Sequence, residues 1–519
     1  MRRRLDPSPV VAICFEVAGP DQVAGWLDRG WMPNLRALRD RGASLALQST
    51  ADLSSGSIWP TVTTGTMPER HGQFFTHMQL EPGSYAIGKR YADDVPLPPF
   101  WDALEAAGLT TALIDVPQTR PRAGFRGVHV VGWGGEYPGW RTSSEPPELM
   151  AEIHGRFGTH PLLDDWRVAA APRDDAECRR LCDDLRTGAA TKAELSRWLF
   201  GRGPFDLFLT VFSETHWALH TLWHLIDPTH PRHDPQLAAR HGGILREVVT
   251  GIDTLIGELA AARPESTVLV FSLSGMGPNY GGAHLLPAIL ERLGLGPVNA
   301  AACDQSPARR PWGRQVVAGV RRAVPIEVLD RIKRLVPSPV WDTATRRLFH
   351  AGAGWRRSRA FALPNDAPGA VRINLRGREP SGLVAPGAER DALLAQIEAA
   401  LRELVLVDTG QPAVRDVRRL PLTATTASGL PDLVVSWAEG YPVEAVRSAR
   451  IGELREASPE LRTGAHRNEG VLIAAGPAIA ARGRTERGRI VDLAPTIVAL
   501  SGAEPPPALD GEVLAQLLR

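Results

Sequence analysis

Short apolar runs alternate with longer amphipathic segments along most of the chain. The apolar runs predict buried strands at Val10–Phe15, Thr110–Ile114, Leu207–Phe212, Thr267–Leu273, Leu433–Trp437 and Val471–Ala475. Several are unbroken stretches of Val, Leu, Ile and Phe, which is typical of strands that helices cover on both faces. The amphipathic segments predict helices at Asn34–Arg41, Phe100–Ala107, Ala176–Leu199, Leu237–Leu259, Glu389–Leu404 and Asp492–Leu500. This alternation predicts an α/β fold in which helices flank a mostly parallel central sheet.

Two stretches interrupt the alternation. Trp133–Arg173 is rich in Pro, Gly and Trp, and Ala283–Arg359 contains a basic helical segment and several Pro. Long excursions from a compact sheet are often functional. We therefore interpret residues 1–519 as a single α/β domain and the two stretches as insertions that form a cap over the active site.

Composition and charge narrow the class of protein. The chain has 519 residues, a net charge of +1 and 43% hydrophobic residues, which argues against extended disorder and against a dedicated binder of nucleic-acid polymers or anionic membranes. Its longest apolar runs fall short of the ~18 residues that a membrane span needs. Four cysteines (Cys14, Cys178, Cys182 and Cys303) are too few for a disulfide scaffold. We expect a soluble cytoplasmic protein with reduced cysteines.

Candidate catalytic side chains occur where the predicted strands end. Glu16 follows the first strand, His216 and His220 follow the third, Ser274 closes the fourth, and His466 precedes the last. In an open parallel sheet, ligands bind beyond the carboxyl ends of the strands, so we expect these side chains to converge there. The i, i+4 spacing of His216 and His220 places two imidazoles on one helix face, which is compatible with a metal site. The alternative is a stripe of histidines, extended by His224, whose rings are satisfied locally.

Ser55 precedes a predicted helix at Ile58–Thr64. Free backbone N–H groups and the positive end of the helix dipole favour phosphate at such a position and lower the cost of an alkoxide. The alternative role is an N-cap, which serines commonly supply.

Together the motifs resemble the alkaline phosphatase superfamily, in its type I phosphodiesterase/nucleotide pyrophosphatase branch. The resemblance extends from Val10 to the C-terminus. Its markers, in chain order, are Met32–Leu35, Ser55 with Trp59, Thr64–Gly72, Phe212–His224, Ser272–Pro278, Phe361–Asp366, Val371–Glu379, Gly464–Gly470 and Asp492–Thr496. The resemblance implies a mixed α/β core that holds two zinc ions beside a Ser or Thr nucleophile.

Carried over residue by residue, the resemblance implies that Ser55 is the nucleophile. It implies that the first metal site, which normally takes Asp, His and His, consists here of His216, His220 and His466. The second site normally takes an Asp, the nucleophile and an Asp-His pair. At those positions this chain has Glu16, Ser55, Leu273 and Ser274.

The second site therefore departs from the family pattern. Leu273 cannot coordinate an ion and the neutral Ser274 is a poor ligand, so we expect that site to be empty of zinc and the three-histidine site to hold one zinc ion. One hypothesis is a metal-dependent hydrolase of small phosphate esters, phosphodiesters or sulfate esters. It would use one zinc ion, Ser55 or a zinc-bound water as the nucleophile, and Glu16 as a general base in place of the missing ion. The other is a catalytically weakened or inactive relative that binds a ligand or partner. Other chemistry on the same fold, such as phosphomutase-like transfer, stays open.

Overall fold

The structure is a computed structural model, and it describes residues 8–75, 79–88, 94–135, 142–163, 166–296, 352–421, 429–484 and 486–519. Within these ranges, every helix is too short or too polar to cross a membrane. The free thiols of Cys14, Cys178 and Cys182 are buried, and Cys303 lies outside the described residues.

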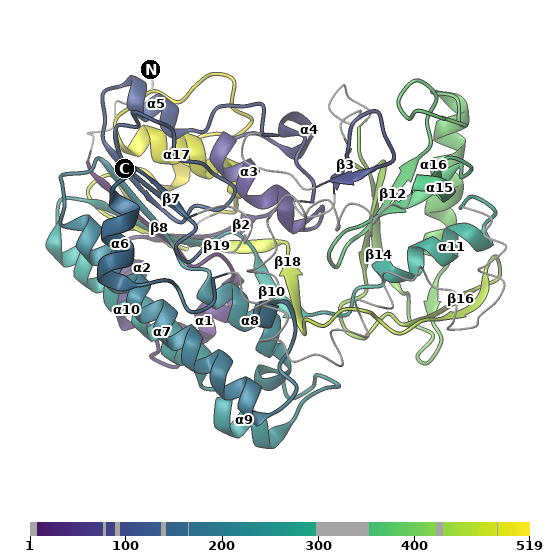
Figure 1. Cartoon of the computed structure of the whole chain (residues 1–519), viewed down its shortest axis with the longest axis horizontal. Helices are drawn as coiled ribbons and strands as arrows, with labels where there is room; N and C mark the ends of the chain where they lie inside the picture. The colour runs from purple at the N-terminus through teal and green to yellow at the C-terminus, as the bar shows by residue number, and fades with distance from the viewer. Residues whose placement is uncertain are drawn as a thin grey trace.

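A large mixed sheet forms the centre of the molecule and confirms the predicted fold class (Figure 1). Its parallel strands are β1 (Val10–Cys14), β8 (Leu207–Val211), β9 (Thr267–Ser272), β5 (Thr111–Ile114) and β6 (Gly127–Val131). The order is β20-β2-β19-β9-β1-β8-β5-β6-β7. β19 (Glu469–Ala475) runs antiparallel between β9 and β2 (Ala43–Gln48), and β7 (Ser143–Glu145) is an antiparallel edge strand. β20 (Gly483–Arg484) and β21 (Gly488–Arg489) pair with β2.

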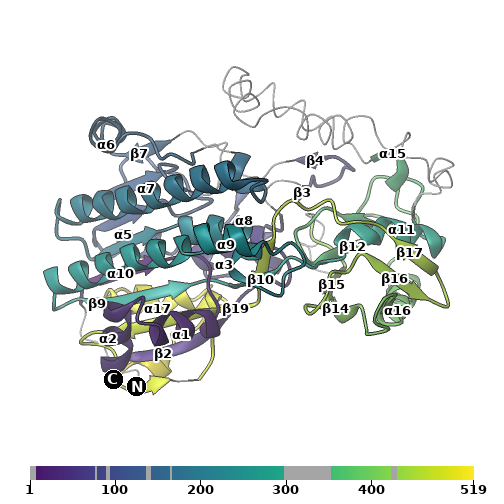
Figure 2. The ribbon, with the colours of Figure 1, turned by 90° about the horizontal axis from the view of Figure 1, so that it is seen from below.

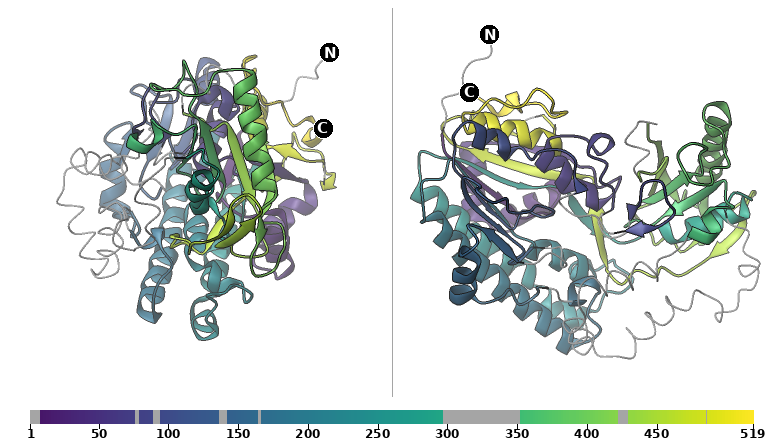
Figure 3. Two further views of the ribbon diagram at one scale, coloured as in Figure 1. Left: turned by 90° about the vertical axis from the view of Figure 1, so that its right-hand side faces the viewer. Right: turned by 45° about the horizontal axis from the view of Figure 1, so that its top comes forward.

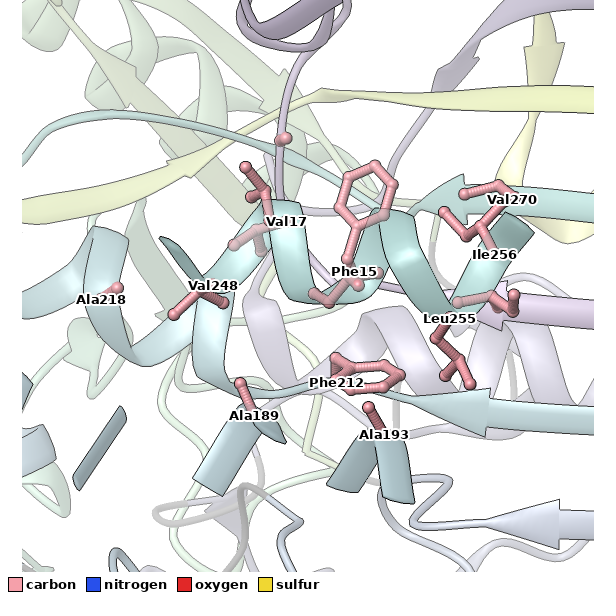
Figure 4. Close-up of a cluster of buried hydrophobic side chains, with 14 of the residues drawn as sticks. Phe15, Val17, Ala189, Ala193, Phe212, Ala218, Val248, Leu255, Ile256 and Val270 are labelled. Atoms are coloured by element: carbon pink, nitrogen blue, oxygen red, sulfur yellow. The ribbon is translucent and has the colours of Figure 1, made fainter. Parts of the chain in front are cut away.

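Helices cover both faces of this sheet because alternate strand residues point in opposite directions. From β1, Val11 and Ile13 face one layer, whereas Val10 and Ala12 face the other. The first layer comprises α1 (Pro20–Asp28), α2 (Pro33–Arg41), α6 (Leu149–Phe157), α7 (Asp175–Phe200), α8 (Glu214–Ile226) and α10 (Ile244–Ala262). The second comprises α3 (Ile58–Thr64), α5 (Trp101–Ala106) and α17 (Leu493–Leu500). Figure 2 shows the long helices α7 and α10 lying together along the sheet, and Figure 4 shows side chains of the first core.

The predicted helix Leu237–Leu259 is wrong at its start. The chain instead forms α9 (Pro235–His241) and then α10, with Gly242 and Gly243 between them. Asp234 caps α9 by accepting hydrogen bonds from the backbone of the first turn. Because glycine disfavours a helix interior, the glycine pair separates the two helices.

A second lobe contains its own sheet and hydrophobic core, on the right of Figure 1. Its antiparallel sheet has the order β11-β12-β15-β14, from Ala360–Leu363, Gly369–Ile373, Leu433–Trp437 and Val414–Arg419. The strand Leu433–Trp437 was expected in the central sheet, but it belongs here, because an apolar run does not specify its neighbours. The lobe also contains α11 (Leu286–Arg292), α15 (Gly352–Trp355), α16 (Ala388–Arg402) and a sheet of β13 (Val405–Leu406), β16 (Ala445–Ser448) and β17 (Gly452–Arg455).

A two-stranded antiparallel ribbon connects the lobes (Figure 3). Its strands are β10 (Gly275–Pro278), which follows β9, and β18 (Gly464–Arg467), which precedes β19. A separate apolar cluster also joins them. It packs Leu53 and Phe74 of the first lobe against Phe361 and Val434 of the second. The hairpin of β3 (Gln79–Leu80) and β4 (Ile87–Gly88) contributes to the same cluster.

The two predicted insertions are described only in part. From the first, β7 joins the edge of the central sheet and α6 packs on its core. Residues 136–141, 164–165 and 297–351 lie outside the described residues, and these include most of the second insertion. The expectation that the insertions cap the site therefore stays a prediction.

Candidate active site

The predicted site residues lie at the carboxyl ends of the central parallel strands. Glu16 follows β1, His216 lies in the first turn of α8 after β8, and Ser274 follows β9. His466 belongs to β18, and it reaches the same edge because the adjoining β19 runs antiparallel and begins there. The topology therefore explains why one site residue precedes its sheet strand while the others follow theirs.

Three histidines meet at this edge. His216 and His220 are one turn apart on α8, with ring centroids separated by 4.5 Å. The Nε2 atom of His466 lies 3.1 Å from Nε2 of His216 and 3.2 Å from Nε2 of His220. One nitrogen of each ring lies within 4.8 Å of the other two, so the group is placed to share one ion.

The partner of each Nδ1 atom sets the protonation of the ring. Nδ1 of His220 lies 2.7 Å from the carbonyl oxygen of Gly464, and Nδ1 of His216 lies 3.1 Å from Oε2 of Glu16. Both partners are hydrogen-bond acceptors, so we assign the hydrogen to Nδ1 in each neutral ring, where it donates. Nδ1 of His466 faces the hydroxyl of Ser274 at 2.8 Å, and a hydroxyl can accept in the same way. This assignment directs three Nε2 lone pairs toward one point.

Burial keeps His220 neutral and therefore able to bind a metal cation. Desolvation lowers the pKa of His220 well below its usual value of 6.5, and the neighbouring Arg462 lowers it further. His220 therefore stays neutral at neutral pH, as a metal ligand must. By contrast, His224 turns away from the cluster toward Thr463, and burial lowers its pKa to about 4. His224 is thus a locally satisfied histidine, as the alternative reading of the stripe proposed.

The separations of His466 Nε2 from the other two nitrogens fit a tetrahedral zinc ion, and all three nitrogens lie within 4.8 Å of one another. Zinc–nitrogen bonds of ~2.0–2.1 Å at a tetrahedral angle separate two ligand atoms by roughly 3.3 Å. The observed separations of 3.1 and 3.2 Å are close to that value. Lone pairs that face one another at this distance repel, and a cation between them removes the repulsion. The donor set therefore fits the metal that the family resemblance implies.

Close backbone packing holds the third histidine near α8. A Cβ atom added at Gly464 would lie only 2.1 Å from the carbonyl oxygen of Leu219. Glycine at this position therefore lets β18 approach the helix. The approach brings the Gly464 carbonyl to His220 and places His466 two residues further along the strand.

Glu16 is held on two sides. Oε1 accepts a hydrogen bond from the indole N–H of Trp59 at 2.9 Å, and Oε2 faces Nδ1 of His216. The residue is 3% exposed, and its φ of +53° is unusual for a non-glycine residue. The carboxylate thus lies behind His216 and contacts Trp59, a site residue that the sequence pattern did not predict.

The positions implied for a second metal offer little to an ion. Leu273 is 1% exposed and packs in the second core of the central sheet. The Ser274 hydroxyl is fully buried and contacts His466. Leu273 offers no ligand atom, and the expectation of an empty second metal site stays a prediction.

Ser55 begins a 3₁₀ turn, Ser55–Ser57, that leads directly into α3. The neighbouring serines Ser54 and Ser57 are completely buried, and the Ser57 hydroxyl donates to the backbone carbonyl of Ser54 at 2.7 Å. Ser55 is partly exposed, so it is the serine of this turn that a ligand can reach. Trp59 lies one helical turn further on and connects the segment to Glu16.

Asp366 is the polar partner of Ser55. Its Oδ2 atom accepts hydrogen bonds from the Ser55 hydroxyl and from the Ser55 backbone N–H, the latter with N···O 3.2 Å. Asp366 ends one of the family motifs in the sequence, but the motif did not predict a role for it. The sequence does show an acidic residue in the polar turn after the strand Ala360–Leu363. Its contact with Ser55 could not be predicted, because the two residues are 311 positions apart in the chain.

Comparison with known proteins gives one family. The sequence profile of the type I phosphodiesterase/nucleotide pyrophosphatase family matches residues 10–441. A search of curated protein sequences finds no match to the chain.

Several solved structures align over nearly the whole chain at low identity. Human ectonucleotide pyrophosphatase/phosphodiesterase 5 is 12% identical, with a TM-score of 0.48, over 98% of this chain and 100% of that chain. An inactive form of the murine protein in complex with AMP is 12% identical, with a TM-score of 0.48, over 99% of this chain and 100% of that chain. Phosphonoacetate hydrolase from Sinorhizobium meliloti 1021, in complex with phosphonoacetate, is 14% identical, with a TM-score of 0.48, over 96% of this chain and 97% of that chain.

Proposed function

Because the chain belongs to the type I phosphodiesterase/nucleotide pyrophosphatase family, we propose that it is a metal-dependent hydrolase of small phosphate esters, with phosphodiesters as the preferred class. His216, His220 and His466 hold one zinc ion, and Ser55 is the nucleophile. The observation that carries the proposal is the convergence of three histidine Nε2 atoms at the edge of the sheet where ligands bind.

The three histidines supply nitrogen donors and leave a fourth tetrahedral position for substrate. A zinc ion bound there stabilises negative charge on phosphoryl oxygens as a Lewis acid. Glu16 and the Gly464 carbonyl orient two of the rings by accepting hydrogen bonds from Nδ1. Since both carboxylate oxygens of Glu16 have such partners, its contacts support this orienting role more than the role of general base.

One ion is the expected number. A second ion would need ligands at Leu273 and Ser274, and the first of these side chains is part of the apolar core. The usual two-ion arrangement neutralises both the attacking and the leaving oxygen. With one ion, this chain's own residues must assist the attacking oxygen.

The exposure of Ser55 supports it as that attacking group. The hydroxyl is partly exposed at the start of the turn that leads into α3. Attack by its oxygen on phosphorus breaks one P–O ester bond and releases the alcohol or phosphate leaving group, and it forms a phosphoseryl intermediate that keeps the second ester group of a diester. Water then hydrolyses the intermediate and restores the hydroxyl.

A second candidate function is ligand binding by a catalytically weakened relative. The observation that favours it is Leu273, because an apolar core residue stands where the family keeps a charged ligand. On this alternative the three-histidine site still binds metal and a phosphate ester, but turnover is absent.

Rapid-quench kinetics with an aryl phosphodiester distinguish the two. Zinc-loaded wild type should release the aryl alcohol and carry a phosphoseryl adduct at Ser55, seen by peptide mass spectrometry. Ser55→Ala should lose both signals, whereas Ser143→Ala, on the edge strand β7, should keep them. Binding of the diester without turnover by wild type would support the second candidate, and full activity of Ser55→Ala would exclude Ser55 as nucleophile.

A further inference from the structure

A carboxylate from the second lobe contacts the proposed nucleophile. Asp366 lies in the turn between β11 and β12, and its Oδ2 atom accepts the hydrogen bond of the Ser55 hydroxyl. The same oxygen accepts the Ser55 backbone N–H at 3.2 Å. The carboxylate therefore contacts the proton that must leave when the serine oxygen attacks phosphorus.

The neighbouring contacts fix this carboxylate relative to the serine. The side-chain amide of Asn365 donates to the carbonyl oxygen of Leu53 at 2.9 Å, which attaches the Asp366 turn to the Ser55 segment. Leu53 also packs with Phe361 of β11 in the apolar cluster that joins the lobes. Asn365, next to Asp366, is thus hydrogen-bonded to Leu53, which lies two residues before Ser55. This contact preserves the geometry that proton transfer requires.

The sequence departs from its family at the point where such a base is needed. Leu273 and Ser274 stand where ligands of a second ion are expected, and that ion would otherwise promote ionisation of the serine. The carboxylate of Glu16 is occupied by Trp59 and His216. Among the carboxylates in the described ranges, Asp366 is the one that accepts a hydrogen bond from the Ser55 hydroxyl.

We infer that Asp366 is the general base that activates Ser55. This inference rests on the proposed function, because it requires Ser55 to be the nucleophile. As the Ser55 oxygen forms its bond to phosphorus, its proton passes to Oδ2 of Asp366 and the leaving-group oxygen departs with the electron pair of the broken P–O bond. In the second half-reaction, water gives its OH group to phosphorus and its remaining proton to the medium. Asp366 then returns its proton to the Ser55 oxygen as the Ser55–phosphorus bond breaks.

A purely structural role makes a different prediction. If Asp366 serves only as an acceptor that caps the Ser55 turn, then Asp366→Asn should be tolerated, since the amide oxygen accepts the same hydrogen bonds. If Asp366 is the base, the amide cannot take the proton, and formation of the phosphoseryl adduct should slow about 100- to 10,000-fold. Asp366→Glu keeps a base and should recover part of that loss.

The test measures adduct formation at Ser55 in single-turnover experiments on the zinc-loaded full chain, with the aryl phosphodiester as probe. Labelling of Ser55 by a fluorophosphonate serves as a second readout that needs no turnover. Asp52→Asn is the matched control, because it removes a carboxylate that lies three residues from Ser55 and pairs with Arg418. We expect Asp52→Asn to stay within about tenfold of wild type, and thermal unfolding of each variant verifies folding.

The outcomes separate this inference from the proposed function. Slow adduct formation and slow labelling in Asp366→Asn support the base, provided that Asp366→Glu recovers part of the rate and that the diester concentration giving half the maximal single-turnover rate changes little. If Asp366→Asn forms the adduct as fast as wild type, and wild type is labelled at Ser55, the inference about Asp366 is overturned while Ser55 remains the nucleophile. An equal loss in Asp52→Asn also overturns it, since the effect is then one of general charge. A wild type with neither turnover nor labelling at Ser55 overturns both proposals.

Discussion

Replacing Glu16 with Gln should weaken zinc binding although Glu16 is not itself one of the three ligands. Its carboxylate accepts from two donors, the Trp59 indole and Nδ1 of His216. A glutamine has one acceptor oxygen, so its amide N–H₂ must face one of these donors. If it faces His216, the ring has to move its hydrogen to Nε2, which removes the lone pair that the metal needs.

The size of the effect follows from the geometry. The carboxylate oxygen lies 3.1 Å from Nδ1 of His216. With the ring and a Zn–N bond of ~2.0 Å added, the charge is roughly 6–7 Å from the ion. Coulomb attraction between −1 and +2 at that distance is about 5 kcal/mol for an effective dielectric constant of ~20, an upper limit that omits desolvation. Removing partners of ligating histidines typically weakens metal affinity about 10- to 100-fold, and we expect Glu16→Gln to fall in this range.

A competition titration of zinc-free protein against a fluorescent zinc chelator measures the change. Glu16→Gln should raise the Kd about 10- to 100-fold, whereas Trp59→Phe, which keeps the charge and loses one donor, should raise it only a few-fold. His220→Ala, which removes a ligand, should exceed both. If Glu16→Gln binds zinc as tightly as wild type while His220→Ala does not, the assignment of the His216 proton to Nδ1 is wrong.

Two further predictions concern stability. Burial lowers the pKa of His129 to about 3, from the usual 6.5, so the unfolded chain binds this proton below about pH 6.5 and the folded chain does not. His129 should therefore cost about 2 kcal/mol of stability between pH 7 and pH 5, and urea unfolding of His129→Gln should show a loss smaller by about that amount, whereas an unchanged loss would refute this source. The Lys192–Asp115 pair is fully buried, so Lys192→Met should destabilise the fold by about 3–5 kcal/mol and Lys192→Met with Asp115→Asn by less. Equal losses in the single and double variants would show that the uncompensated charge is not the cause.

The local elements of the fold were largely predictable. The helix Ile58–Thr64 has the predicted bounds, and the first strand differs from prediction by one residue at its end. Periodicity works here because buried strands and amphipathic helices impose it on their own residues. It could not place Leu433–Trp437 in the second sheet, since the pairing partners of an apolar strand lie far away in the chain.

The site was predictable in its donors and less so in their surroundings. The spacing of His216 and His220 on one helix was visible in the sequence, and the family resemblance added His466. The contacts of Glu16 and Ser274 with histidine Nδ1 atoms could not be predicted, because a histidine's hydrogen-bond partner depends on the positions of side chains from separate strands. Asp366 was missed for the same reason, since a turn of the second lobe brings it to Ser55.

Zinc content is the most direct test of a one-ion site formed by three histidines. Purified protein is stripped of metal with a chelator, reloaded with zinc and freed of excess metal. Its zinc is then measured by elemental mass spectrometry and divided by the protein concentration. We predict about one zinc per wild-type chain and close to none in His466→Ala, with both proteins folded. Two tightly bound zinc ions in wild type would contradict the loss of the second site at Leu273 and Ser274. An absence of bound zinc in wild type, or full retention in His466→Ala, would contradict the three-histidine site itself.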